Sequence, residues 1–101
     1  MEKEKIKEIV LTQVREIVLT FEEGNMFEVN ENTILFGSGS RIDSLSLVSV
    51  IVDLEALFSD AHGFDISLTD DRAMTRQISP FDSITTLVDY IFEIINERKN
   101  S

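Results

Sequence analysis

Three stretches of the chain repeat apolar residues at three- and four-residue steps, the spacing of one face of an α-helix. The first helix is predicted over residues 3–22 and the last over residues 82–98. A middle helix is predicted from Asp43-Ser44 to about Phe58. It is too apolar for a lone surface helix, so we expect one buried face and further apolar residues left exposed as a contact surface. These three stretches predict an all-α fold.

The segments between the helices are interpreted mainly as loops. Residues 23–43 have no sustained period, and residues 33–36 could form a strand but lack an evident partner. We interpret the whole segment as a long loop whose apolar residues lie against the helices. A short helix is predicted around residues 72–76, before the break at Ser79-Pro80. The expected architecture is a four-helix bundle of three long helices and one short one, in a single domain over residues 1–101.

The charge balance narrows the possible partners. Nine basic and nineteen acidic residues give a net charge of −10, which argues against nucleic acid or anionic lipid as a partner and favours proteins with basic patches. The chain has no cysteine, so it has no disulfide and no thiolate of its own. It has no signal-peptide core and no run of about 20 apolar residues, so we expect a cytoplasmic protein without stable membrane insertion.

Few residues are candidates for catalysis or for metal binding. His62 is the only histidine, and beside Gly63 it is interpreted as a solvated loop residue rather than part of a Ser-His-acid triad. The run Gly37-Ser38-Gly39-Ser40 lacks the end of a nucleotide-binding loop and is interpreted as a flexible loop. The acid pairs Glu22-Glu23 and Asp70-Asp71 lack the alternating ligands of a calcium loop. We therefore expect no catalytic residue and no metal site.

The most informative short motif is Asp43-Ser44-Leu45, because of its position. A serine stands where the long loop ends and the apolar helix begins. In one interpretation Asp43 or Ser44 is a helix N-cap, whose side-chain oxygen accepts hydrogen bonds from the free backbone N–H groups of the first turn. In the other, the exposed hydroxyl is an attachment point. A phosphodiester on it would lie at the positive end of the helix dipole, which stabilises anions by about 0.3–1 kcal/mol.

With this motif, the chain resembles an acyl carrier protein. The resemblance rests on the acidic charge, on the order of helix, long loop, helix, short helix and helix, and on the motif Ile42-Asp43-Ser44-Leu45. Phe64-Asp65-Ile66 and the stretch 84–91 are similar to the end of the family's sequence pattern. The similarity covers about residues 3–97, which is nearly the whole chain.

The resemblance implies a function and an attachment site. Ser44 would receive phosphopantetheine from coenzyme A through a magnesium-dependent phosphopantetheinyl transferase, to which Asp43 would present the adjacent acid. The thiol of this arm would carry acyl intermediates as thioesters between enzymes of fatty-acid, lipid or polyketide-type biosynthesis. A chain without cysteine would thereby gain a thiol. The protein itself would be a non-catalytic carrier, and we expect a monomer that moves between its enzymes.

The resemblance also implies which side chains meet other molecules. Acyl-transfer and synthase enzymes with basic patches would contact Leu45, Val48, Val52, Asp53 and Glu55. An acyl chain would enter a core lined by Ile51, Leu54 and Ile84. The middle helix has fewer acids in its first turns than fatty-acid carriers have, and Arg41 stands just before the motif. These departures favour a specialised carrier with its own partner enzymes.

Two alternatives stay open. A peptidyl or aryl carrier protein of nonribosomal synthesis would use the same serine, although the aspartate before Ser44, the stand-alone length and the acidity favour the acyl class. An acidic helical adaptor belongs to a different class, and in it Ser44 would be only a helix cap. That alternative predicts that Ser44→Ala leaves function intact and lowers stability by about 1 kcal/mol.

Overall fold

The part of the chain that the computed structural model describes comprises residues 2–63, 65–69, 73, 75 and 77–100, and it contains three α-helices and no β-strand. The helices are α1 (Lys3–Val18), α2 (Ser44–His62) and α4 (Ile84–Asn100), and a short 3-10 helix, η1 (Glu23–Asn25), follows α1. The prediction of an all-α fold is therefore confirmed. Most of the predicted short helix, residues 72–76, lies outside the described residues.

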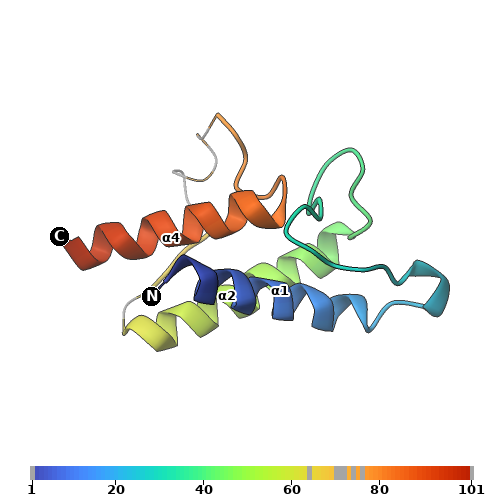
Figure 1. Cartoon of the computed structure of the whole chain (residues 1–101), viewed down its shortest axis with the longest axis horizontal. Coiled ribbons are helices and arrows are strands. Elements are labelled where there is room, and N and C mark those ends of the chain that lie inside the picture. Colours follow the sequence, from blue (N-terminus) through green and yellow to red (C-terminus); the bar gives the residue numbers. More distant parts are fainter. Residues whose placement is uncertain (1, 64, 70–72, 74, 76, 101) are drawn as a thin grey trace.

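The three helices lie along one another around a single apolar core (Figure 1). Helix α1 packs against both α2 and α4 and runs in the opposite direction to them, so the two ends of the chain lie toward the same side. Every buried residue of the described chain is hydrophobic. The largest fully buried side chains include Tyr90, Phe58, Leu35 and Leu54.

Helix α1 ends at Val18, so the helix predicted for residues 19–22 was wrong. The Thr20 hydroxyl donates a hydrogen bond to the Ile17 carbonyl oxygen at 2.6 Å, and the Thr20 backbone N–H donates to the same oxygen at 3.0 Å. The Phe21 N–H donates to the Val18 carbonyl oxygen in the same three-residue step. These bonds tighten the last turn and compete with continuation of the α-helix.

Helix α2 continues to His62, beyond the predicted end near Phe58. It ends at Gly63, whose φ of 73° is left-handed and whose N–H donates to the Ser59 carbonyl oxygen at 2.9 Å. Glycine adopts this conformation without a Cβ clash, so Gly63 sets the end of the helix. His62 therefore lies half-buried in the last turn of α2, and its interpretation as a loop residue was wrong.

The long loop between α1 and α2 is joined to the start of α4. Ile34 forms an isolated antiparallel bridge with Ser83, and the Leu35 N–H donates to the Asp82 carbonyl oxygen at 3.1 Å. The prediction that apolar loop residues lie against the helices is confirmed for Val29, Leu35 and Ile42, which belong to the core. It was wrong for Ile34 and Phe36, whose side chains are exposed.

Helix α4 begins with a reciprocal cap. The Thr86 N–H donates to the Ser83 hydroxyl oxygen at 3.3 Å, and the Ser83 N–H donates to the Thr86 hydroxyl oxygen at 3.0 Å. Each side chain satisfies a backbone donor that the helix leaves unpaired at its start. Ser83 is therefore the residue that caps α4.

Candidate functional site

The backbone just before Ser44 is held in place by a serine and a buried side chain. The Ser40 hydroxyl donates to the Leu35 carbonyl oxygen at 3.0 Å and accepts from the Ile42 N–H at 3.1 Å. The Ile42 side chain is buried in the core. These contacts fix the point at which the chain enters α2, and so they fix the position of Ser44.

Two glycines form the turn that leads to this point. Gly37 and Gly39 have φ values of 96° and 90°, in a region that other residues rarely adopt. The Ser40 N–H donates to the Gly37 carbonyl oxygen at 3.1 Å. A Cβ on Gly39 would lie 3.2 Å from Cδ1 of Ile34, so the loop also packs closely there. The glycine-serine run is therefore a hydrogen-bonded turn, whereas the sequence suggested a flexible loop.

Asp43 caps α2, and Ser44 does not. The Asp43 carboxylate accepts from the Ser46 N–H at 2.7 Å through Oδ1 and from the Ser46 hydroxyl at 3.1 Å through Oδ2. Both bonds stabilise the charged carboxylate and hold the pKa of Asp43 below its usual value. Ser44 is the exposed first residue of the helix, and the cap does not use its hydroxyl. The helix therefore does not need this serine in order to begin.

The lowered pKa of Asp43 leads to a prediction for stability at low pH. A carboxyl group whose pKa is lower in the folded state stabilises that state above the unfolded pKa of about 3.9. This contribution is lost as the pH falls through the folded-state pKa. Asp43→Asn keeps a capping oxygen but cannot ionise. We expect the wild type to melt at a higher temperature than Asp43→Asn at neutral pH, and the difference to shrink below about pH 4.

Thermal denaturation followed by circular dichroism measures this difference. Asp53→Asn is the matched control, because Asp53 is exposed on the same helix and does not cap it. A difference between the wild type and Asp43→Asn that stays constant down to the lowest pH would contradict the role of the Asp43 charge.

Helix α2 exposes an apolar stripe beside Ser44, formed by Leu45, Val48 and Val52, which we call the α2 stripe. The exposed fractions of these side chains are 79%, 54% and 55%. Their three- and four-residue spacing places them on one side of the helix. No charged residue occurs between positions 44 and 52. Three of the five predicted partner-binding residues thus form one uncharged surface next to the candidate attachment point, which is typical of a contact surface.

The two acidic residues predicted to meet a partner have different surroundings. Asp53 is exposed. Glu55 is half-buried, and its Oε2 accepts from the Leu68 N–H at 2.7 Å. The Glu55 carboxylate therefore ties the segment after α2 to the helix. Of the two, Asp53 is the acid that α2 presents to solvent.

Sequence reasoning noted Arg41 only as a departure from the family pattern and missed its partner, Phe27. The guanidinium carbon of Arg41 lies 4.8 Å from the centre of the Phe27 ring, within the range of a cation–π interaction. Arg41 also lines a hollow of about 540 Å³ between the end of α1 and the start of α2, which we call the loop hollow. The lining residues of the loop hollow are Phe21, Glu22, Asn25, Arg41 and Asp43.

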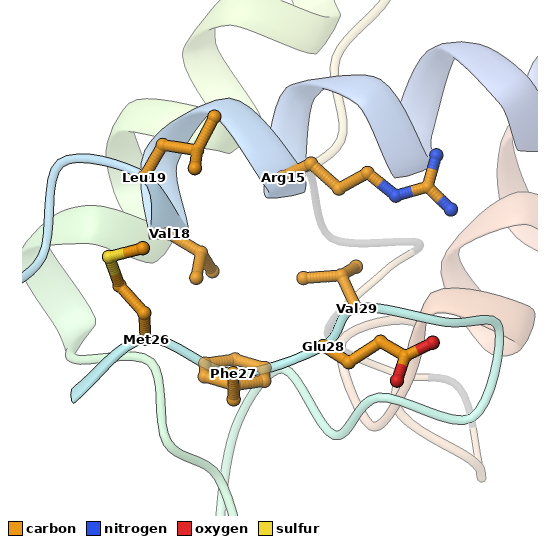
Figure 2. Close-up of a pocket in the computed structure, with 7 residues that line it drawn as sticks. All are labelled: Arg15, Val18, Leu19, Met26, Phe27, Glu28 and Val29. Carbon is orange, nitrogen blue, oxygen red and sulfur yellow. The ribbon is translucent and has the colours of Figure 1, made fainter. Parts of the chain in front are cut away.

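A second hollow, of about 320 Å³, lies between the end of α1 and residues 26–29 (Figure 2). Apolar side chains surround it, and the charged ends of Arg15 and Glu28 extend toward the same edge. Its lining residues are Arg15, Val18, Leu19, Met26, Phe27, Glu28 and Val29. Phe27 thus lines this hollow and also stacks with Arg41. The lining of the second hollow is mainly apolar, and at its edge it has two residues of opposite charge, Arg15 and Glu28.

The residues that the resemblance implies for an acyl chain are all buried in the core. They are Ile51, Leu54 and Ile84. Their side chains come from α2 and from the first turn of α4. An acyl chain would reach them only if neighbouring side chains moved apart, since protein cores are close-packed.

The described residues hold neither a metal-binding cluster nor a helix that could cross a membrane. No three histidine, cysteine or acidic side chains in this part of the chain come together as a metal site. None of the described helices combines the length and the apolar character that crossing a membrane requires.

No protein-family model, no curated protein and no solved structure matches the chain.

Proposed function

We propose that the protein is an acyl carrier whose Ser44 bears phosphopantetheine, and that its fold is a four-helix acyl-carrier-like bundle. The observation that carries the proposal is the position of Ser44. It is exposed at the first residue of α2, while Asp43 performs the capping. A hydroxyl without a part in the cap, next to an exposed apolar stripe, suits an attachment site.

The chemistry of attachment fits this position. The Ser44 Oγ would form a bond to the phosphorus next to the pantetheine of coenzyme A, and the pyrophosphate bond would break. The adenosine bisphosphate half would leave with the electron pair, and the serine proton would pass to a base of the transferase. The positive end of the helix dipole at the start of α2 favours a phosphodiester there. When bound, the group supplies the thiol that the chain lacks, on which an acyl group is held as a thioester.

The α2 stripe together with Asp53 is the proposed contact surface for the transferase and for acyl-transfer and synthase enzymes. The net charge of −10 favours encounter with basic patches on these enzymes, and the stripe supplies apolar area at the contact. We propose a monomer in the cytoplasm, since a carrier has to reach several enzymes in turn. The adaptor alternative explained Ser44 as a helix cap, and it loses that explanation because Asp43 is the cap.

Incubation with coenzyme A, Mg²⁺ and a broad-specificity phosphopantetheinyl transferase tests the proposal. We expect the intact mass of the wild type to rise by one phosphopantetheine, with the modified peptide containing Ser44. Ser44→Ala should keep its original mass. Ser49→Ala is the matched control, because Ser49 is also exposed on α2 but lies after the first turn, and it should be modified like the wild type.

The folding of each variant is checked by circular dichroism before the reaction. Absence of any mass gain in the folded wild type would overturn the carrier proposal. Modification of Ser44→Ala to the same extent as the wild type would overturn the assignment of the site.

A further inference from the structure

We propose that Arg41 and the loop hollow form a binding site, which we call the seat, for the part of phosphopantetheine nearest Ser44. In this seat the Arg41 guanidinium pairs with the phosphodiester on Ser44, and the amide-bearing section of pantetheine that follows lies in the hollow. This inference rests on the proposed function, because the seat has an occupant only when Ser44 carries phosphopantetheine. It concerns the side of α2 that faces the end of α1, away from the buried core.

The first argument is position. Arg41 and Asp43 both line the loop hollow, while Ile42 between them is buried in the core. Successive side chains point to opposite sides of this segment. Those of Arg41 and Asp43 therefore line the hollow, while that of Ile42 anchors the segment in the core. Ser44 follows this segment directly in the chain. A group attached to Ser44 therefore starts at the edge of the hollow.

The second argument is the state of the Arg41 charge. Arg41 takes part in none of the ion pairs found between described residues, which involve Lys3 and Lys7. Its guanidinium instead lies over the Phe27 ring. This stacking restricts the side chain in advance, so an anion that binds it loses less side-chain entropy. Arginine also presents a planar set of donors that suits phosphate oxygens.

The acidic groups that face Arg41 across the loop hollow are Glu22 and Asp43. The two carboxylate oxygens of Asp43 already accept from Ser46. Glu22 is exposed, and it is the acid that competes with a phosphodiester for the guanidinium. Removing its charge should therefore strengthen the seat.

The third argument is the chemistry of the lining. The Asn25 side chain can donate to and accept from the amide groups of pantetheine, and Phe21 offers a half-buried ring to its dimethyl carbon. The volume of about 540 Å³ lies in the range of small-molecule sites. The hollow thus combines one cation, amide partners and an apolar surface, which are the groups that this arm needs.

Two-dimensional ¹H–¹⁵N NMR of the apo and phosphopantetheinylated protein tests the seat. In the wild type we expect attachment to shift the backbone signals of residues 21–25 and the Arg41 side-chain Nε–H signal, besides those next to Ser44. Arg41→Gln should lose the shifts at residues 21–25 and keep those next to Ser44. Arg15→Gln is the control, because it removes the same charge from the second hollow, and it should behave like the wild type.

Two further variants test how Phe27 and Glu22 affect the binding of the phosphodiester by Arg41. Phe27→Leu removes the stacking ring but keeps an apolar side chain, and it should reduce the shifts at residues 21–25. Glu22→Gln should increase the shift of the Arg41 signal. The ³¹P chemical shift of the phosphodiester should differ between the wild type and Arg41→Gln, because the variant lacks the guanidinium that pairs with the phosphodiester.

The outcomes separate this inference from the carrier proposal. An intact mass that shows the arm on Ser44, with shifts confined to the first turn of α2, would overturn the seat and leave the carrier standing. Retention of the shifts at residues 21–25 in Arg41→Gln would also overturn it. Failure of the folded wild type to accept the arm would overturn both proposals.

Discussion

Replacing Leu54 with alanine is expected to lower the free energy of unfolding by about 2–5 kcal/mol. Leu54 is fully buried in the middle of α2. The change removes apolar contacts and leaves a cavity that its neighbours fill only in part. Domains of this kind are typically stable by about 5–15 kcal/mol, so the loss is a large fraction of the total. The melting temperature should fall by at least about 8 °C.

Leu45→Ala is the matched control for this prediction, since it makes the same chemical change on the same helix. Leu45 is the most exposed residue of the α2 stripe, and its truncation should change the free energy of unfolding by less than about 0.5 kcal/mol. Urea denaturation of both variants measures the two values. Equal losses would mean that α2 presents a different face to the core.

Leu45→Ser is expected to slow the attachment of phosphopantetheine, with kcat/KM for the transferase falling about 10–100-fold. Full burial of a leucine side chain in a contact is worth about 1.5–3 kcal/mol, and each 1.36 kcal/mol is about tenfold in rate. Leu45 directly follows Ser44, so an enzyme that reaches the hydroxyl has to cover it. The melting temperature should stay close to that of the wild type, because Leu45 makes little contact within the chain.

Leu57→Ser is the control for docking. Leu57 is 42% exposed on the same helix but lies about a third of a turn away from Leu45 around its axis. We expect its kcat/KM to remain within about twofold of the wild type, which corresponds to less than 0.5 kcal/mol. An unchanged rate for Leu45→Ser would show that the enzyme does not dock on the α2 stripe.

The helices could be predicted from the sequence because their apolar spacing is a local property. Residues such as Val10 and Val14, four positions apart on one face, are both buried. The ends of the helices were predicted less well. Helix α1 stops where the Thr20 hydroxyl bonds to a backbone oxygen, and α2 continues until Gly63 allows a left-handed turn. Single side chains decide such ends, and periodicity does not detect them.

Some features of the candidate site could likewise be predicted from the sequence, and others could not. The position of Ser44 followed from a cap signal, and an exposed apolar face on the middle helix followed from its apolar pattern, and both are local. The three residues of the α2 stripe were named from the resemblance to acyl carrier proteins. The Arg41–Phe27 stack and the hydrogen bond from the Leu68 N–H to Glu55 join residues that lie on either side of irregular segments. Neither contact leaves a pattern in the sequence, because its geometry depends on how the loops are folded against the helices.

The most direct test of the carrier account is the intact mass of the protein purified from its own cells. The chain alone has a mass of 11.5 kDa. The account predicts a species heavier by one phosphopantetheine and species heavier still by acyl groups, and hydroxylamine, which cleaves thioesters, should remove the acyl groups and leave the arm. Ser44→Ala expressed in the same cells should show only the mass of its chain. A wild-type protein that carries no group in cells that produce it would contradict the account.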